Sequence, residues 1–378
     1  MAVTALAARL KAEGKDIISL STGEPDFDTP GFIEEAGINA IRNHFTRYTD
    51  VGGIAELKDA IIQKFERDNG LKYQRNQILV STGAKQTIFN LCLAVLDPGD
   101  EVIIPAPYWV SYPDMVMLAD GLPVTPDAGL AQGYKITPRQ LEAAITPKTK
   151  LFLLNSPSNP TGAAYTRAEL RALGEVLIKS PRVLIGTDDM YEKIYWAAEP
   201  FCSLVTAVPE LYGRTVTING HSKSYAMTGW RMGYCGGPKE IVAAMSTIQS
   251  QSTSNPSSIA QKAATAALLG DQAIVAQMNE AYKKRHDFVN TGLNAIPGIK
   301  CLRGSGTFYA FADVSGAMAK LGHRDDNQFA EYLLNTVGVA VVAGSSFGAP
   351  GHMRISFATS DELLEKALER IAKACQSG

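Results

Sequence analysis

The stretch Ile78-Leu79-Val80-Ser81-Thr82-Gly83, followed by the run from Ala84 to Leu96, decides the fold class of this chain. The first part is a short apolar segment that ends in a glycine turn, and the second has the length and apolar spacing of a helix. The sequence Asp97-Pro98-Gly99-Asp100 then predicts a turn. Together these residues predict a strand, a glycine turn and a helix in direct succession.

The same pattern continues along the chain. Four further short segments, rich in Leu or β-branched residues, are separated by helical stretches such as 167–179: they are Glu101 to Ile104, Leu151 to Leu154, Val183 to Gly186 and Thr215 to Ile218. Strands that are apolar on both faces and alternate with helices indicate a parallel sheet. We therefore predict an α/β fold.

The two flanks of this region have a different pattern. Residues 53–69 carry apolar side chains at helical spacing among charges, and this predicts an amphipathic helix that stops at Asn69-Gly70. After about Asn255 a long interrupted helix is expected over 260–289, followed by a smaller alternating region over 298–375. We interpret that last region as part of a second domain.

Composition excludes several classes of protein. The 378 residues include 36 Lys plus Arg and 38 Asp plus Glu, giving a formal net charge of −2, so nothing favours nucleic acid or an anionic membrane as a partner. Hydrophobic residues make up 46%, which is ordinary for a globular protein and excludes disorder. Two or three domains, or one large α/β unit, fit this length.

Targeting and metal signals are missing. Residues 1–20 mix charged and apolar residues without a signal-peptide core, and no apolar run approaches the roughly 18 residues of a membrane helix. The five cysteines form no C-x-x-C pair and the five histidines form no H-E-x-x-H motif. We therefore expect a cytoplasmic protein with reduced thiols and no bound metal.

Nucleotide-binding motifs are also missing from the sequence. No G-x-G-x-x-G follows a predicted strand, and no P-loop G-x-x-x-x-G-K-[ST] occurs. Interpretations as a dehydrogenase or a P-loop enzyme therefore lose their support.

Four segments place reactive residues at strand ends or in glycine turns, where ligand sites of α/β proteins form. They are Asn155-Ser156-Pro157-Ser158-Asn159-Pro160-Thr161-Gly162, Thr187-Asp188-Asp189-Met190-Tyr191, the run from His221 to Arg231, and His352-Met353-Arg354-Ile355-Ser356. In this order, and with Gly23-Glu24-Pro25-Asp26-Phe27 before them, they resemble the class I aminotransferases that depend on pyridoxal 5′-phosphate. Bacterial aspartate aminotransferases are the most similar members, and the resemblance covers essentially the whole chain.

The resemblance implies a fold and an assembly. It implies a fold-type-I transferase with a large cofactor domain around a mostly parallel sheet, residues 31–275, and a smaller α/β domain from residues 1–30 and 276–378. It also implies a homodimer with shared active sites. The family usually has a longer N-terminal arm before the predicted helix over residues 2–13, so we expect looser closure over substrate.

The resemblance assigns the central chemistry to three residues. Lys223 matches the family lysine that bonds the cofactor covalently, although a lysine in a Ser-Lys-Ser turn is by itself usually a surface charge. Burial beside other cations would lower its pKa, as an amine nucleophile and proton carrier requires. Asp188 matches the partner of the pyridine nitrogen, with Asp189 expected to cap a following helix. Tyr191, together with Asn159, would donate to the phenolic oxygen of the cofactor.

The phosphate of the cofactor needs several donors. The turn Gly83-Ala84-Lys85 opens a predicted helix, whose N-terminus offers backbone N–H groups and the positive end of a dipole. Arg231 matches the family arginine that holds the phosphate. Tyr48 resembles the tyrosine that reaches the phosphate from the neighbouring subunit. Gly220 departs from the Ser or Thr found in many relatives, and Ser222 is the candidate that compensates.

The resemblance also assigns residues that bind the substrate. Trp109 resembles the aromatic side chain that stacks on the pyridine ring, a core tryptophan being the alternative. Arg354 matches the arginine that holds the substrate α-carboxylate by a bidentate bridge, assisted by Asn159 and the Gly23 backbone.

Lys85 is the residue on which substrate choice depends. A cation at this position favours a substrate with a distal carboxylate, such as aspartate or glutamate. The alternative is that Lys85 is an exposed lysine at a helix N-terminus with no role in binding. The sequence thus predicts a transaminase that moves the amino group of L-aspartate to 2-oxoglutarate by a ping-pong mechanism. Aminotransferases for aromatic amino acids, alanine or prephenate stay open, as do a β-lyase and a cyclopropane-forming synthase on the same scaffold.

Overall fold

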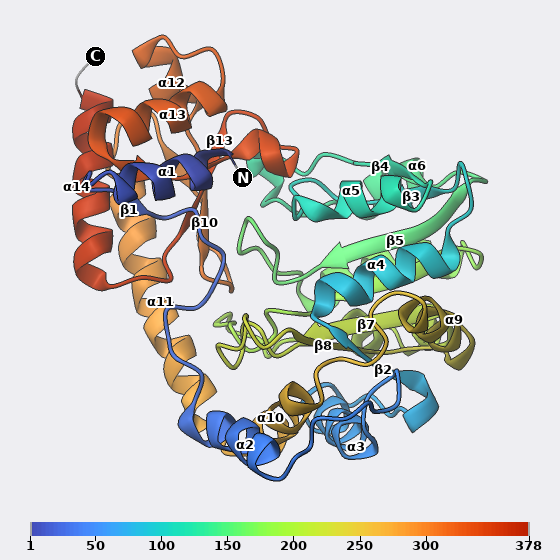
Figure 1. Cartoon of the computed structure of the whole chain (residues 1–378). Helices are drawn as coiled ribbons and strands as arrows, with labels where there is room; N and C mark the ends of the chain where they lie inside the picture. Colours follow the sequence, from blue (N-terminus) through green and yellow to red (C-terminus); the bar gives the residue numbers. More distant parts are fainter. Residues whose placement is uncertain (1, 377–378) are drawn as a thin grey trace.

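The computed structural model describes residues 2–376, and its largest element is a seven-stranded sheet in the order β2-β8-β7-β6-β5-β3-β4 (Figure 1). Only β8 runs antiparallel to its neighbours. The strands are β2 (Ile78–Thr82), β3 (Glu101–Ile103), β4 (Leu122–Val124), β5 (Thr149–Asn155), β6 (Leu184–Asp188), β7 (Thr215–Gly220) and β8 (Met232–Gly236). The predicted α/β class with a mostly parallel sheet is confirmed.

Helices cover both faces of this sheet, as the strand pattern predicts. Along β5, Leu151 and Leu153 join one core cluster, while Phe152 and Leu154 join a second on the opposite face. The helices are α2 (Gly31–Arg42), α3 (Ala55–Lys64), α4 (Ala84–Val95), α5 (Ser111–Leu118), α6 (Pro138–Ala144), α7 (Arg167–Ile178), α8 (Leu204–Ala207), α9 (Lys239–Ser250) and α10 (Ser258–Leu269). Burial on both faces explains why these strands lack the alternation of polar and apolar residues.

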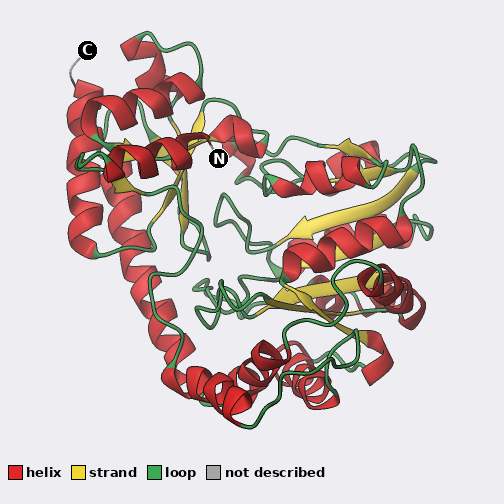
Figure 2. Ribbon diagram, in the orientation of Figure 1, coloured by secondary structure: helices red, strands yellow, loops and turns green. Residues whose placement is uncertain are grey.

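A second, four-stranded antiparallel sheet has the order β12-β13-β10-β9. Its strands are β9 (Lys300–Cys301), β10 (Tyr309–Asp313), β12 (Val342–Ala343) and β13 (His352–Ser356), and its helices are α12 (Ser315–Leu321), α13 (Asp326–Val337) and α14 (Asp361–Gln376). The start of the chain, with α1 (Ala2–Ala12), belongs to the same lobe because β1 (Ile18–Ser19) pairs in parallel with β11 (Val339–Ala340) in a separate two-stranded sheet. Figure 2 shows this smaller lobe at the upper left, apart from the large sheet.

The long helix α11 (Ala273–Asn294) runs from the lower end of the large lobe to the small one (Figure 1). The predicted domain boundary at residues 275 and 276 falls in the first turn of this helix. The division of the chain into residues 31–275 and residues 1–30 with 276–378 stays a prediction.

Some elements differ from the expected ones. The helix predicted over 53–69 is α3 followed by a π-helical turn over Phe65–Asn69. The long helix over 260–289 is interrupted, as expected, and the interruption lies at residues 270–272 between α10 and α11. Short 3-10 helices occupy Arg75–Gln77, Leu130–Gln132, Pro209–Arg214 and Gly344–Phe347. Among residues 2–376, no helix is long and apolar enough to cross a membrane.

Candidate active site

A cavity of about 470 Å³ lies at the carboxyl ends of the parallel strands, facing the small lobe. It is lined by all the candidate site residues except Gly83 and Tyr48. Adjacent strand ends bring two of the motifs together, because Asn155 on β5 pairs in register with Asp188 on β6. A crevice outside the carboxyl ends of the strands is where open α/β sheets bind ligands.

Lys223 follows β7 and its amine lies in the cavity. Its Nζ donates a hydrogen bond of 2.6 Å to the carbonyl oxygen of Gly23. Burial lowers the pKa of Lys223 to about 8, with Arg354 lowering it further and Glu24 raising it. The neutral amine, which a nucleophile and base requires, is therefore far more populated near neutral pH than in an ordinary lysine.

Asp188 ends β6 with its carboxylate facing the cavity. Its Oδ2 accepts a 2.6 Å hydrogen bond from the Tyr112 hydroxyl, and its Oδ1 accepts one of 3.1 Å from the backbone N–H of Met190. Burial raises the pKa of Asp188, although both hydrogen bonds oppose this effect. A cationic partner in the cavity would relieve the unfavourable burial of this carboxylate.

The expected capping role of Asp189 is wrong. No helix follows Asp189, since residues 190–194 form turns, and its carboxyl group is buried in the protein interior. Burial raises the pKa of Asp189 to about 8. The two neighbouring aspartates therefore point in different directions, as alternation along an extended strand end requires.

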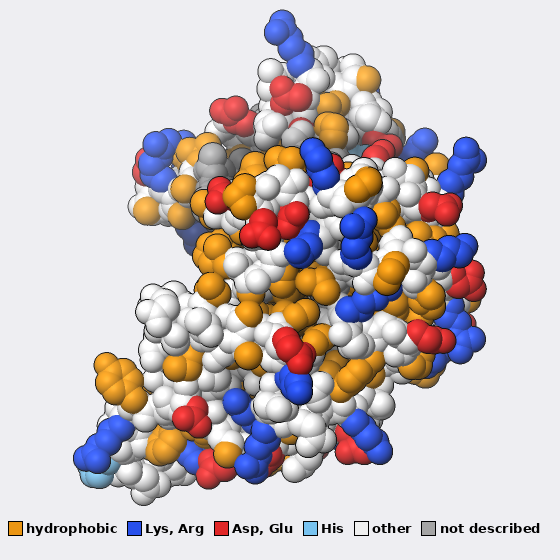
Figure 3. Space-filling model, turned by 90° about the vertical axis from the view of Figure 1, so that its right-hand side faces the viewer, with side chains coloured by type: hydrophobic (Ala, Val, Ile, Leu, Met, Phe, Trp, Pro, Cys, Tyr) orange, Lys and Arg blue, Asp and Glu red, His pale blue; other side chains and the backbone are white. Residues whose placement is uncertain are grey.

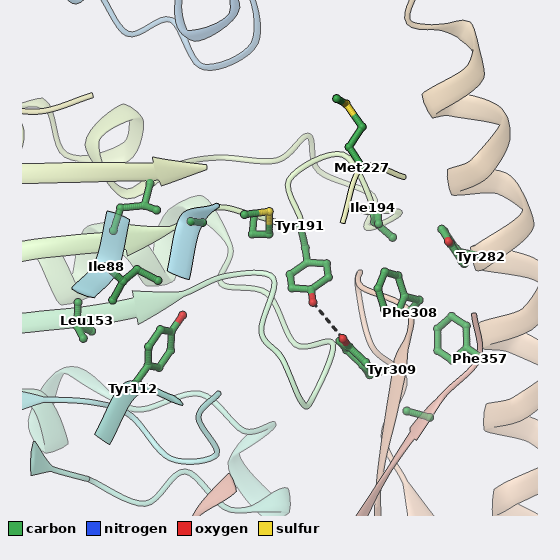
Figure 4. Packing of buried hydrophobic residues seen from close by; sticks show 14 of the residues in the cluster. Ile88, Tyr112, Leu153, Tyr191, Ile194, Met227, Tyr282, Phe308, Tyr309 and Phe357 are labelled. Carbon is green, nitrogen blue, oxygen red and sulfur yellow. Dashed lines mark hydrogen bonds between the residues drawn. The ribbon is translucent and has the colours of Figure 1, made fainter. Parts of the chain in front are cut away.

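Tyr191 and Tyr309 face each other across the floor of the cavity, with their hydroxyl oxygens 3.2 Å apart (Figure 4). Burial and the neighbouring hydroxyl of Tyr309 raise the pKa of Tyr191 well above its ordinary value, so the phenol stays protonated and can donate. Sequence reasoning missed Tyr112 and Tyr309. The one available signal for Tyr112 was its place three residues after Trp109, one helical turn away.

Arg354 occupies the opposite wall, on β13 of the small sheet. Its Nη1 donates to Asn159 Oδ1 at 3.0 Å and its Nη2 donates to the Ser21 carbonyl oxygen at 2.8 Å. The guanidinium also lies over the Tyr309 ring, 4.3 Å from its centroid. The buried Nε has no partner among the described residues, so the group keeps donor capacity for an anion.

A second cationic region surrounds the start of α4. Gly83 precedes this helix with φ +81°, and a Cβ added there would lie 2.3 Å from Nη2 of Arg231. The missing side chain therefore lets the guanidinium lie directly against the helix N-terminus. Ala84 and Ser222 line the cavity beside it. Backbone N–H groups, a helix dipole and an arginine together form a site for a phosphate-sized anion.

Packing accounts for the glycine at position 220. A Cβ on Gly220 would lie 2.9 Å from Cε of Met190 and 3.0 Å from the carbonyl oxygen of Met232. A serine or threonine at this position would require the neighbouring chain to shift.

Comparison with known proteins agrees with this geometry. The family model for aminotransferase class I and II matches residues 15–371. The chain belongs to this family. It is 57% identical to an aspartate/prephenate aminotransferase of Nitrosomonas europaea, over 98% of this chain and 95% of that protein. It is 50% identical to an aspartate aminotransferase of Rhizobium meliloti, over 99% and 92%.

Solved structures give the same result. The crystal structure of the aspartate aminotransferase from Rhizobium meliloti superposes with a TM-score of 0.96 at 49% identity, over 99% of this chain and 95% of that one. The Thermus thermophilus aspartate aminotransferase with maleate gives 0.93 at 43% identity, over the same shares. The predicted fold-type-I transaminase, close to bacterial aspartate aminotransferases, is confirmed.

The two remaining aromatic candidates of this aminotransferase, Tyr48 and Trp109, differ in position. The Tyr48 side chain is 92% exposed and does not line the cavity of its own chain. Trp109 lines the cavity, with its ring edge-to-face with Tyr112 at 5.3 Å and the Lys85 amine 4.9 Å from its centroid. Trp109 therefore packs only partly into the core and presents ring surface to the cavity.

The lowered pKa of Lys223 predicts a pH profile for its reactivity in the cofactor-free aminotransferase. The neutral amine is the nucleophile, so labelling by trinitrobenzenesulfonate should rise with pH and level off above a midpoint near pH 8, the value to which burial lowers this pKa. Peptide mass spectrometry follows the adduct, and Lys223→Ala gives the background. Labelling that still rises at the ordinary lysine value of 10.5 would contradict the assignment.

Proposed function

We propose that this aminotransferase binds pyridoxal 5′-phosphate and transfers the amino group of L-aspartate to 2-oxoglutarate by a ping-pong mechanism. The observation that carries the proposal is the cavity in which the amine of Lys223 and the buried carboxylate of Asp188 lie with Arg231 and Arg354. An amine with a lowered pKa, a carboxylate that lacks a cationic partner and two separate anion sites fit one phosphorylated pyridine and one amino acid.

The residues present fit this cofactor. Arg231 and the start of α4 would hold its phosphate, and Asp188 would pair with its ring nitrogen. Because Oδ1 of Asn159 is used by Arg354, the amide NH2 of Asn159 is left to donate to the phenolic oxygen beside Tyr191. When bound, the cofactor supplies an electron-accepting ring for the carbanion of the substrate.

The protein side chains would supply binding, orientation and proton transfer. Asp188, fixed by the Tyr112 hydroxyl, keeps a proton on the ring nitrogen. Lys223 would first act as a general base that takes the proton from the substrate Cα. It would then act as a general acid that donates the proton again. Arg354 would hold the substrate α-carboxylate and Trp109 would pack against the ring of the cofactor, so that together they would orient the substrate for proton transfer.

Lys85 supports an acidic substrate. It lines the cavity mouth at the start of α4, next to Trp109, where a distal carboxylate would be within its reach. The relatives named above carry aspartate in their names, and the Thermus enzyme was solved with maleate, a dicarboxylate. Prephenate, which also has a second carboxylate, is a second candidate because the relatives from Nitrosomonas europaea and Cereibacter sphaeroides are named for it.

A visible spectrum tests the first half of the reaction. The purified protein loaded with pyridoxal phosphate should show a visible band, and aspartate should replace it with the near-ultraviolet band of the aminated cofactor. Adding 2-oxoglutarate should then restore the visible band, because the two substrates react in turn. Lys223→Ala lacks the amine and should show neither the original band nor its cycling. A band that aspartate leaves unchanged, or that Lys223→Ala retains, contradicts the proposal.

Substrate choice is tested by Lys85→Ala. Losing one charged partner of a carboxylate should lower kcat/KM for aspartate by about tenfold or more. Values for alanine and phenylalanine, measured with the same acceptor, should stay close to those of the unchanged protein and serve as the internal control. An aspartate preference that survives the substitution removes Lys85 from the specificity argument.

We also propose a homodimer in which Tyr48 reaches the phosphate of the neighbouring subunit. An exposed tyrosine that is absent from its own cavity supports this role. The Tyr48→Ala homodimer should bind pyridoxal phosphate weakly. In a mixed dimer, one protomer carries Tyr48→Ala and the other carries Lys223→Ala. One of its two sites then combines an intact Lys223 with an intact Tyr48 from the other protomer, and this site should bind pyridoxal phosphate with unaltered affinity. A monomer in sedimentation, or mixed dimers without such a site, would refute the shared site.

A further inference from the structure

A buried ion pair lies behind the cavity, outside the residues that line it. The amine of Lys64, the last residue of α3, contacts the Glu192 carboxylate, and both side chains are only 3% exposed. Asn69 completes the group, because its Oδ1 accepts from Lys64 Nζ at 2.7 Å and its Nδ2 donates to Glu192 Oε2 at 2.9 Å. Each of the three side chains thus contacts both of the others.

The π-helical turn over Phe65–Asn69 makes this closed arrangement possible. A π turn brings residues five positions apart to the same side, which is the separation of Lys64 and Asn69. The same turn makes a second ion pair to the next residue, since Asp68 Oδ2 lies 2.9 Å from the Lys193 amine. Two consecutive residues, Glu192 and Lys193, are therefore held by one turn.

These contacts fix a segment that has no regular structure of its own. After β6 the chain passes through turns, with Glu192 N–H donating to the Asp189 carbonyl at 3.0 Å and Ile194 N–H to Tyr191 at 2.9 Å. Asp188, the last residue of β6, leads into this segment, and Tyr191 lies on it; both line the cavity. Glu192, directly after Tyr191, points away from the cavity and into the protein.

Further ionisable groups surround the pair, and one of them is the Asp68 carboxylate, which pairs with Lys193 and also interacts with Lys64. Asp189 and His221 also face Lys64, and burial keeps both largely neutral: it raises the pKa of Asp189 to about 8 and lowers that of His221 to about 4. A buried ion pair is often no more stabilising than apolar side chains of the same size, while it fixes a more specific geometry. Stability alone therefore does not account for this group.

We propose that Lys64, Asn69 and Glu192 are positioning residues that hold Asp188 and Tyr191 in place against the cofactor. The inference rests on the proposed binding of pyridoxal phosphate at this site. The three side chains act through the turn over residues 188–192 and do not touch the cavity.

The test uses Glu192→Gln, which keeps the size of the side chain and removes its charge. Loss of the anchor should displace the Tyr191 hydroxyl, weakening binding of pyridoxal phosphate to the cofactor-free protein by about tenfold. It should also raise the pH midpoint of the visible absorbance change of the bound cofactor, because the phenolic oxygen loses a donor. Fluorescence titration and a spectroscopic pH titration measure the two effects.

Two further variants separate positioning from stability. Leu173→Ala truncates a buried side chain of the second core cluster, on α7, and should lower the melting temperature while leaving the pH midpoint unchanged. The double variant Lys64→Met with Glu192→Leu leaves no unpaired charge and should fold, yet it should show the raised midpoint. The proposal is overturned if the pH midpoint of the absorbance change and the affinity for pyridoxal phosphate are unaltered in Glu192→Gln or in the double variant. If the unchanged protein fails to bind pyridoxal phosphate, the proposed function fails instead.

Discussion

One guanidinium at the wall of the cavity joins three distant parts of the chain. Arg354 belongs to the small sheet, Ser21 to the segment after β1, and Asn159 to the loop after β5 of the large sheet. Because arginine presents several donors in a rigid plane, it can hold two acceptors and still offer capacity to an anion. The residue proposed to bind the substrate is therefore also the one that ties the two lobes together around the substrate position.

Local environment, and not overall charge, sets the chemistry of this cavity. The net charge of −2 does not favour a polyanion partner, and Figure 3 shows basic and acidic side chains interspersed over one face of the molecule. Inside the cavity the lowered pKa of Lys223 has burial as its largest cause, ahead of the neighbouring arginines. Exclusion of water by a bound substrate would act in the same direction, so closing the site favours the neutral amine further.

Motifs at strand ends were the part of the site that the sequence predicted well, because parallel strands end at one edge and bring their next residues together. Asn155 beside Asp188 is the clearest case. Contacts between distant segments gave no such signal. Tyr309 comes from the small sheet, and Glu192 meets Lys64 only through an unpredicted π turn. Strand β8 was missed because its sequence, Met-Gly-Tyr-Cys-Gly, has no β-branched residue.

The glycines of β8 show why local propensity fails at this point. A Cβ on Gly233 would lie 2.2 Å from the backbone nitrogen of Ala84, so the strand can pass the start of α4 only with glycine there. That close approach places the strand directly against Gly83 and Ala84 at the start of α4, where the Arg231 guanidinium also lies. A residue with higher strand propensity would fill the space beside the proposed phosphate site. The proposed phosphate site therefore depends on a strand whose sequence is unfavourable for a strand, and close packing at Gly233 explains the glycine where strand propensity does not.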